Sequence, residues 1–287
     1  MKVAYDPTNR FEINVWDTEF RRTPTRTLMA RVYQPKKAGP LPVLLDLHGG
    51  AWNNQDRTAN APMDESLAAS GILVVAIDLT LAPEAPYPAS VQDANYGVRW
   101  LKHKAPEWGG DPQTIGALGS SSGGHVVELC AMRPNDPYYS VHKLADAPEL
   151  DATLNYVATR SPVSDPYARY LNAEKLARHE MVQNSKTYFN PWDTIHDGNP
   201  QEILDRGEQV RLPPLLIMQG ELDDNVRPAV QEKFVTSYRA AGGECQYEVF
   251  AGCEHLWIRE PGPQTDRAYD TLKQFIARQL SAKRLAA

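Results

Sequence analysis

The sequence is poor in residues that build covalent or metal-linked frameworks. Its 287 residues include three cysteines, Cys130, Cys245 and Cys253, which cannot all pair within one chain and show no CxxC spacing. We therefore expect buried free thiols and no disulfide framework. The seven histidines show neither an HxxxH nor an HxH spacing. We accordingly predict no metal site and no other cofactor.

Long hydrophobic runs and a surplus of positive charge are also missing. No run approaches transmembrane length, and the first seven residues lack the apolar core of a signal peptide, so we expect a cytoplasmic protein that does not bind membranes. The net charge is −6 and Lys and Arg are scattered, which argues against nucleic acid as a partner. This balance suits a small-molecule substrate. A homodimer is left open.

Low-complexity linkers, charge runs and internal repeats are absent, so we predict one domain over residues 1–287. Hydrophobic residues make up 42% of the chain, which is ample for one core. Apolar runs of strand length at 42–47, 72–78 and 115–118 alternate with helical patterns. This alternation predicts an α/β fold in which a mostly parallel sheet carries helices on both faces.

Further strands are expected on either side of this unit. Residues 11–16 and 28–33 alternate between apolar and polar side chains, which predicts half-buried strands at the open end of the sheet. Apolar runs at 154–159, 213–220 and 245–250 predict the remaining strands.

The regular alternation lapses between the strands predicted at 154–159 and 213–220. Residues from about 166 to 205 combine helix and loop and are rich in aromatic side chains. A long insertion of this kind is often a lid, and we predict a small cap over the site. Packing of the same aromatic side chains into the core is the alternative reading.

A Gly-x-Ser-x-Gly pattern occupies residues 119–123. Taken alone, Gly-Ser-Ser-Ser-Gly also resembles a flexible linker, but here an apolar strand precedes it and a helical run follows it. Between strand and helix, the pattern is typical of a sharp turn that exposes a nucleophilic serine, Ser121. The amide of Ser122 then lies at a helix N-terminus, where negative charge is favoured.

A nucleophilic serine needs a base and an acid, and both follow later strands. Asp223 comes after the strand predicted at 213–220, and His255 comes after the last predicted strand. The chain order Ser121, Asp223, His255 is that of the α/β-hydrolase triad. Asp224 competes with Asp223 for the acidic position.

Four motifs in sequence extend this likeness. They are His48-Gly49-Gly50-Ala51-Trp52, Leu81-Ala82-Pro83-Glu84 with Tyr87-Pro88-Ala89, Gly110-Asp111-Pro112, and Gly119-Ser120-Ser121-Ser122-Gly123-Gly124. In this order they resemble the α/β-hydrolase-fold esterases of the hormone-sensitive-lipase and feruloyl-esterase-like (BD-FAE-type) branch, and the resemblance covers roughly residues 42–260. The His-Gly-Gly-x-Trp motif is also similar to that of arylformamidases.

The resemblance implies roles for individual residues. Ser121 would be the nucleophile, His255 the general base and Asp223 the residue that orients the histidine, since the Gly220-x-x-Asp223 spacing matches the acid loop of the family. The oxyanion hole would be formed by the backbone amides of Gly50, Ala51 and Ser122.

The sequence also suggests positions for two tryptophans and two histidines near these motifs. From their positions in loops that follow strands, Trp52 and Trp257 are expected to line the substrate pocket. His48 is expected to shape its turn, and His125 to begin the helix behind the elbow without a catalytic role.

The predicted function is that of a serine hydrolase that cleaves carboxylic esters of small or aryl substrates. An arylformamidase or other amidase would use the same residues on a C–N bond. A hydrolase-like binding protein is a third alternative, because the fold also hosts receptors in which the triad is broken.

Overall fold

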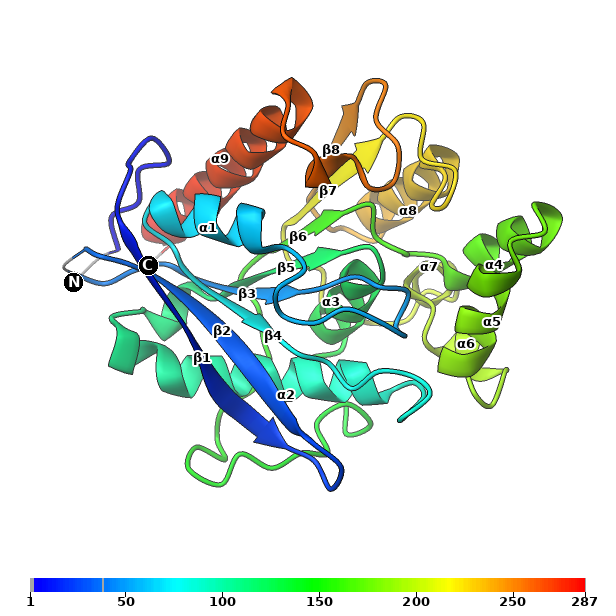
Figure 1. Ribbon diagram of the computed structural model, residues 1–287, viewed down its shortest axis with the longest axis horizontal. Coiled ribbons are helices and arrows are strands. Elements are labelled where there is room, and N and C mark those ends of the chain that lie inside the picture. Colours follow the sequence, from blue (N-terminus) through cyan, green and yellow to red (C-terminus); the bar gives the residue numbers. More distant parts are fainter. Residues whose placement is uncertain (1–2, 38, 287) are drawn as a thin grey trace.

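The computed structural model describes residues 3–37 and 39–286, and the strands of this part form one eight-stranded sheet. In chain order the strands are β1 (Ile13–Arg22), β2 (Thr27–Pro35), β3 (Val43–Leu47), β4 (Leu73–Ile77), β5 (Gly116–Ser120), β6 (Val157–Arg160), β7 (Leu215–Gly220) and β8 (Cys245–Phe250). They lie side by side in the order β1-β2-β4-β3-β5-β6-β7-β8 (Figure 1). The pairs β1–β2 and β2–β4 are antiparallel, and every pair from β4 to β8 is parallel.

Helices connect the strands and cover both faces of the sheet. The α-helices are α1 (Ala61–Ala69), α2 (Ala89–Lys104), α3 (Ser122–Met132), α4 (Pro166–Lys175), α5 (His179–Tyr188), α6 (Thr194–Asp197), α7 (Pro200–Asp205), α8 (Pro228–Ala240) and α9 (Pro263–Ala286). Short 3-10 helices are η1 (Ala105–Trp108), η2 (Pro112–Thr114) and η3 (Trp257–Arg259).

The two faces of the sheet bury two separate hydrophobic clusters. All five residues of β3 are buried, and their side chains alternate between the faces. Leu45 belongs to the cluster under α2, α3 and α8, whereas Leu44 belongs to the cluster under α1 and α9. In Figure 1, α1 and α9 lie on one side of the sheet and α2 lies on the other. This arrangement confirms the predicted α/β class, with a mostly parallel sheet between two helical layers.

The strand boundaries differ from the expected ones in two places. β1 and β2 extend over ten and nine residues and form a longer hairpin than the short alternating segments predicted. β6 begins at Val157 and not at Leu154, although Leu154 is buried in the core. The apolar pattern marks where burial begins, whereas the strand begins where Val157 comes into register with both β5 and β7.

The parallel strands bring their carboxyl ends to one edge of the sheet. The loops after β3, β5, β6, β7 and β8 therefore emerge together, which is where folds of this class place their sites. Positions 1, 2, 38 and 287 of the domain predicted over 1–287 lie outside the described residues.

Candidate active site

Ser121 occupies a sharp turn between β5 and α3. Its φ of 53° and ψ of −115° lie in a region that residues with a side chain rarely adopt. The flanking glycines leave room for this turn: a Cβ atom at Gly119 would lie 2.5 Å from the carbonyl oxygen of Gly123. A Cβ atom at Gly123 would lie 2.3 Å from two carbonyl oxygens at the end of β3. The local sequence thus holds the Ser121 side chain at the edge of the sheet.

Ser121, His255 and Asp223 form a continuous hydrogen-bonded chain. The Oγ atom of Ser121 lies 2.9 Å from Nε2 of His255, and Nδ1 of His255 lies 2.8 Å from Oδ2 of Asp223. Because a carboxylate only accepts, Nδ1 donates to Asp223, and Nε2 is left to accept the proton of the serine hydroxyl. The structure therefore brings together three side chains that come from the loops after β5, β7 and β8.

The protonation states of His255 and Asp223 depend on their burial and on the hydrogen bond between them. Burial lowers the pKa of His255 below its usual value, and the hydrogen bond and charge of Asp223 offset part of this effect. Burial would raise the pKa of Asp223, but the hydrogen bond from His255 and the backbone amide of Val226 hold it below its usual value. At neutral pH the arrangement therefore contains a neutral imidazole beside an ionised carboxylate.

Asp223 and Asp224 point to different partners. Asp223 is buried against His255, whereas the side chain of Asp224 is 69% exposed and forms an ion pair with Arg178. Of the two competing aspartates, the structure places Asp223 at the histidine, as the acid-loop spacing predicts.

The loop after β3 lies directly beside the elbow. A Cβ atom at Gly49 would lie 3.3 Å from Cβ of Ser121, and the amide of Trp52 donates to Oγ of Ser122 over 3.2 Å. Gly50 and Ala51 have φ values of 102° and 51°. The amides of Gly50, Ala51 and Ser122 find no acceptor among the described residues. These are the three amides that the sequence suggests for an oxyanion hole.

The tryptophans expected to line the pocket are located elsewhere, which corrects that part of the sequence analysis. Trp52 is buried and stacks on Tyr188 with ring centroids 4.8 Å apart. Trp257 stacks on Phe250 at 4.5 Å and packs against the cluster under α9. Neither side chain lines the cavity at Ser121: Trp52 packs on an aromatic side chain far along the sequence, and the half-buried Trp257 packs on Phe250, seven residues before it.

His125 and His48 are both buried and do not join the chain at Ser121. Nδ1 of His125 accepts from Nε1 of Trp52, and Nε2 donates to the carbonyl of Gly198 over 2.7 Å. Burial lowers the pKa of His125 to about 4, so it stays neutral. Nδ1 of His48 donates to the carbonyl of Gly49 within its own turn.

A cavity of about 620 Å³ opens in front of Ser121. Its walls come from the loop after β3, the end of β6, α4, α5 and the loops after β7 and β8. A volume of this size fits a small molecule. In the 166–205 segment the aromatic side chains of Tyr188 and Phe189 enter the core, whereas the non-aromatic side chain of Met181 faces the cavity.

Four arginines line the cavity, and none of them has a role in the sequence analysis. Arg160, at the end of β6, donates from Nη1 to the carbonyl of His255 over 2.8 Å and so supports the histidine loop. A charged residue at the carboxyl end of a buried strand was the available signal for Arg160. Arg169 of α4 also lines the cavity, and nothing in the local pattern distinguishes it from other helix residues.

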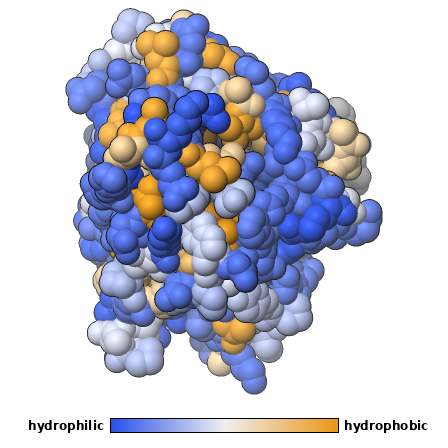
Figure 2. Space-filling view, turned by 90° about the vertical axis from the view of Figure 1, so that its right-hand side faces the viewer, coloured by the Kyte–Doolittle hydropathy of each residue, from blue (hydrophilic) through white to orange (hydrophobic). Residues whose placement is uncertain are grey.

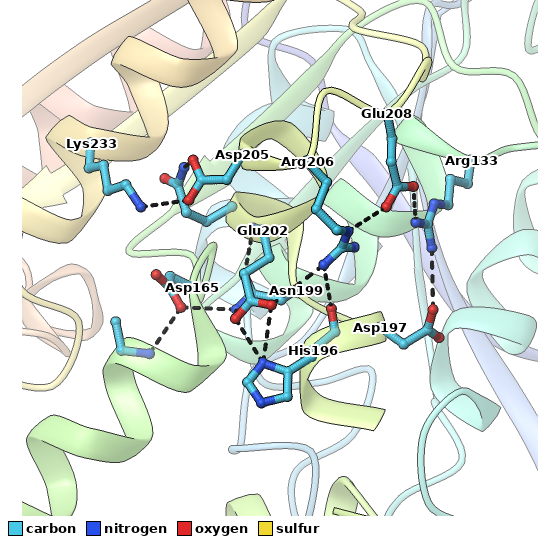
Figure 3. Close-up of polar contacts among 12 residues, drawn as sticks. Arg133, Asp165, His196, Asp197, Asn199, Glu202, Asp205, Arg206, Glu208 and Lys233 are labelled. Carbon is cyan, nitrogen blue, oxygen red and sulfur yellow. Dashed lines mark hydrogen bonds and ion pairs between the residues drawn. The ribbon is translucent and has the colours of Figure 1, made fainter. Parts of the chain in front are cut away.

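Polar contacts fasten α6 and α7 to the rest of the fold (Figure 3). Asp165 caps α4 by accepting from the amide of Ala168, and it also accepts from Nδ2 of Asn199, the residue that caps α7. A hydrogen bond joins His196 to Glu202 beside these caps. Ion pairs also surround them: Arg206–Glu202, Arg206–Glu208, Arg133–Glu208, Arg133–Asp197 and Lys233–Asp205. The segment between β6 and β7 is thus anchored at α3 and α8.

The described part of the chain offers neither a metal-binding cluster nor a membrane-spanning helix. Among residues 3–37 and 39–286, no cluster of three His, Cys, Asp or Glu side chains could hold a metal ion. No helix in this part of the chain combines the length and apolar character needed to cross a membrane.

Comparison with known proteins places the chain in a family. Residues 31–237, well over half of the chain, match BD-FAE. Among curated proteins, esterase LipQ of Mycobacterium tuberculosis is 28% identical over 70% of this chain and 46% of its own length. Esterase LipC of the same organism is 28% identical over 83% of this chain and 58% of its own length. The chain thus spans about half the length of these curated relatives.

Solved structures agree with this assignment at the level of the fold. Esterase B from Lactobacillus rhamnosis superposes with a TM-score of 0.79 at 19% identity, covering 98% of this chain and 89% of that one. The propionate-bound esterase Est2 of Thermogutta terrifontis superposes with a TM-score of 0.72 at 21% identity, covering 93% and 94%. These findings confirm the resemblance noted in the sequence: the chain belongs to the BD-FAE family and has the α/β-hydrolase fold.

Proposed function

We propose that the protein is a carboxylesterase in which Ser121, His255 and Asp223 form the catalytic triad. The observation that carries this proposal is the continuous chain from Ser121 Oγ through both nitrogens of His255 to Asp223, at the mouth of a cavity. The geometry is that of a nucleophile, a base and a residue that orients the base. LipQ and LipC bear the name esterase, which supports the same reaction class.

The reaction follows from these positions. The Ser121 oxygen attacks the ester carbonyl carbon while Nε2 of His255 takes the hydroxyl proton, and the imidazolium then returns this proton to the departing alkoxide. The acyl group stays on Ser121 until a water molecule, deprotonated by His255, displaces it as the carboxylic acid. Asp223 fixes the histidine tautomer and stabilises the imidazolium in both steps.

The negative oxygen of each tetrahedral intermediate needs donors on the other side of Ser121. The amides of Gly50, Ala51 and Ser122 have no acceptor among the described residues, and they lie beside the serine. In this proposal they bind the oxyanion, where removing one donor typically costs about 2.7–4 kcal/mol of transition-state stabilisation.

The segment from α4 to α7 serves in this proposal as a small cap on a single α/β-hydrolase domain. α4 and α5 provide one wall of the cavity, and the Asp165–Asn199 contact and the surrounding ion pairs hold the segment in place. The cap therefore shapes the pocket for a small-molecule ester and stays attached to the core.

The test is hydrolysis of p-nitrophenyl esters from acetate to decanoate, with an N-formyl aryl amide alongside, by the wild type and by Ser121→Ala. We expect the wild type to cleave short esters and Ser121→Ala to lose this activity. Ser120→Ala is the matched control, because this neighbouring serine is buried within β5 and should leave turnover largely intact.

Other outcomes would contradict the proposal. Cleavage of the formamide but of no ester would assign an amidase. Equal activity in Ser121→Ala and the wild type would remove Ser121 from the nucleophile role, and tight binding of esters without turnover would indicate a binding protein.

A further inference from the structure

The cavity in front of Ser121 is lined mainly by polar and charged side chains. The lining includes four arginines: Arg160, Arg169, Arg178 and Arg259. Its acidic members are Glu180, Asp224 and Glu254, and its apolar side chains are Ala51, Met181 and Leu256. On the end of the molecule that carries α4 to α6, hydrophilic side chains predominate and hydrophobic ones occur in small groups (Figure 2). Such a lining does not suit a long aliphatic acyl chain.

One of these arginines is buried and incompletely paired. Arg169 is 4% exposed, and its Nε donates to Oδ1 of Asn225 over 2.8 Å. Its guanidinium lies over the ring of Trp52, 5.5 Å from the centroid. Its Nη1 atom is buried and finds no acceptor among the described residues. A buried charged donor without an acceptor has a free-energy cost. The Nη1 group of Arg169 lacks a compensating acceptor among the described residues.

Two other arginines of the cavity have partners, although the Nε atom of Arg160 is also buried without an acceptor among the described residues. Arg160 donates to the carbonyl of His255, and Arg178 is paired with Asp224. Burial lowers the pKa of Arg169 to about 10, with the nearby Asp223 charge opposing this effect, so the guanidinium remains charged at neutral pH. Among the buried arginines of the cavity wall, Arg169 is the one whose Nη1 lacks an acceptor among the described residues, and it is the candidate partner for an anion.

We propose that the preferred esters of this enzyme carry a carboxylate, and that Arg169 binds this carboxylate and sets the specificity. The inference rests on the proposed esterase function and names its substrate class. A guanidinium favours carboxylates because its N–H groups make charge-assisted hydrogen bonds to them. Inside a low-dielectric wall, a neutral ester would leave the guanidinium charge without a compensating anion from the substrate, whereas an anionic ester would supply one.

The experiment compares anionic esters with neutral isosteres of the same size. On the acyl side, monomethyl succinate carries a carboxylate where methyl 4-oxopentanoate carries a methyl ketone. Acetoxyacetate and acetoxyacetone make the same comparison on the alcohol side. Because charge-assisted hydrogen bonds are stronger than neutral ones, we expect kcat/KM to favour the anionic member of one pair by about tenfold or more. The favoured pair identifies the side that carries the carboxylate.

Substitutions then test whether Arg169 is responsible. Arg169→Met keeps the unbranched stem of the side chain but removes the charge, and it should abolish the preference mainly by raising KM for the anionic ester. Arg169→Lys should retain part of the preference, which separates loss of charge from loss of packing. Arg259→Met is the matched control, because Arg259 lines the same cavity but is exposed.

Three results would overturn the inference. In the first, the wild type has the higher kcat/KM for the neutral isosteres. In the second, Arg169→Met lowers kcat/KM equally for anionic and neutral esters. In the third, Arg259→Met abolishes the preference as fully as Arg169→Met does. Failure of the esterase proposal itself gives a distinct result. In that case p-nitrophenyl acetate is not hydrolysed and a fluorophosphonate does not label Ser121.

Discussion

Asp223 and Asp224 are neighbours in the chain but occupy opposite environments. Asp223 accepts a hydrogen bond from Nδ1 of His255, whereas Asp224 is exposed beside Arg178. We predict that Asp223→Asn lowers kcat on a p-nitrophenyl ester on the order of 10³–10⁴-fold, because the amide favours the wrong histidine tautomer. Asp224→Asn should keep most of the activity. Steady-state kinetics on both purified variants measure the difference, and a larger loss in Asp224→Asn would reassign the acid.

The pH dependence of turnover reports on His255. The base must be neutral, and burial lowers its pKa below the usual 6.5, against the opposing effect of Asp223. Activity should therefore fall as the pH drops through a value below 6.5, and should be level between that inflection and neutral pH. A profile of kcat/KM on an ester without ionisable groups measures this limb. An acid inflection above pH 6.5 would contradict the assigned balance of burial and charge.

At the scale of elements, one aspartate links two helices of the cap segment. Asp165 accepts from the amide of Ala168 at the start of α4 and from Asn199 at the start of α7. We predict that Asp165→Ala lowers the free energy of unfolding by about 1–2 kcal/mol, because both caps lose a partner. Urea denaturation monitored by circular dichroism measures this loss.

The start of α6 offers the control for that substitution. Asp193 occupies the N-cap position of α6, but its side chain makes no capping hydrogen bond. Asp193→Ala should therefore change the unfolding free energy by no more than about 0.5 kcal/mol. Equal losses of unfolding free energy in the two variants would show that the hydrogen bonds of Asp165 to α4 and α7 do not stabilise the fold.

What the sequence could predict depends on how local the cause is. The sheet and the turn at Ser121 could be predicted, because apolar runs, glycines and the strand-to-helix change are all contained within a few residues. The placement of Trp52 could not, since it stacks on Tyr188, which lies more than a hundred residues further along the chain. Arg169 was missed for the same reason: only tertiary packing brings it to the cavity and deprives Nη1 of an acceptor.

At the scale of the whole molecule, the face of the sheet opposite α2 buries two carboxyl groups. Asp46 on β3 accepts two hydrogen bonds from Nδ2 of Asn60, both at 3.0 Å. Asp64 on α1 is fully buried, and neither of its carboxyl oxygens has a partner among the described residues. Burial raises the pKa of both groups, and the charge of Asp46 raises that of Asp64 further. The pKa of Asp46 rises to about 7 and that of Asp64 well above its usual value, so Asp64 is the group that keeps its proton at neutral pH.

A protonated Asp64 makes stability depend on pH. In the unfolded chain this group ionises near pH 4, whereas in the folded protein it keeps its proton to a much higher pH. Unfolding then releases a proton, so the unfolding free energy should fall as the pH rises between 5 and 7, by about 1.4 kcal/mol per pH unit from this group. Asp64→Asn removes that contribution, so the difference between wild type and variant should change with this slope. Glu65→Gln, its exposed neighbour on α1, is the matched control and should run parallel to the wild type. Urea midpoints measured across this pH range decide the question, because parallel curves for wild type and Asp64→Asn would mean that Asp64 is equally ionised in both states.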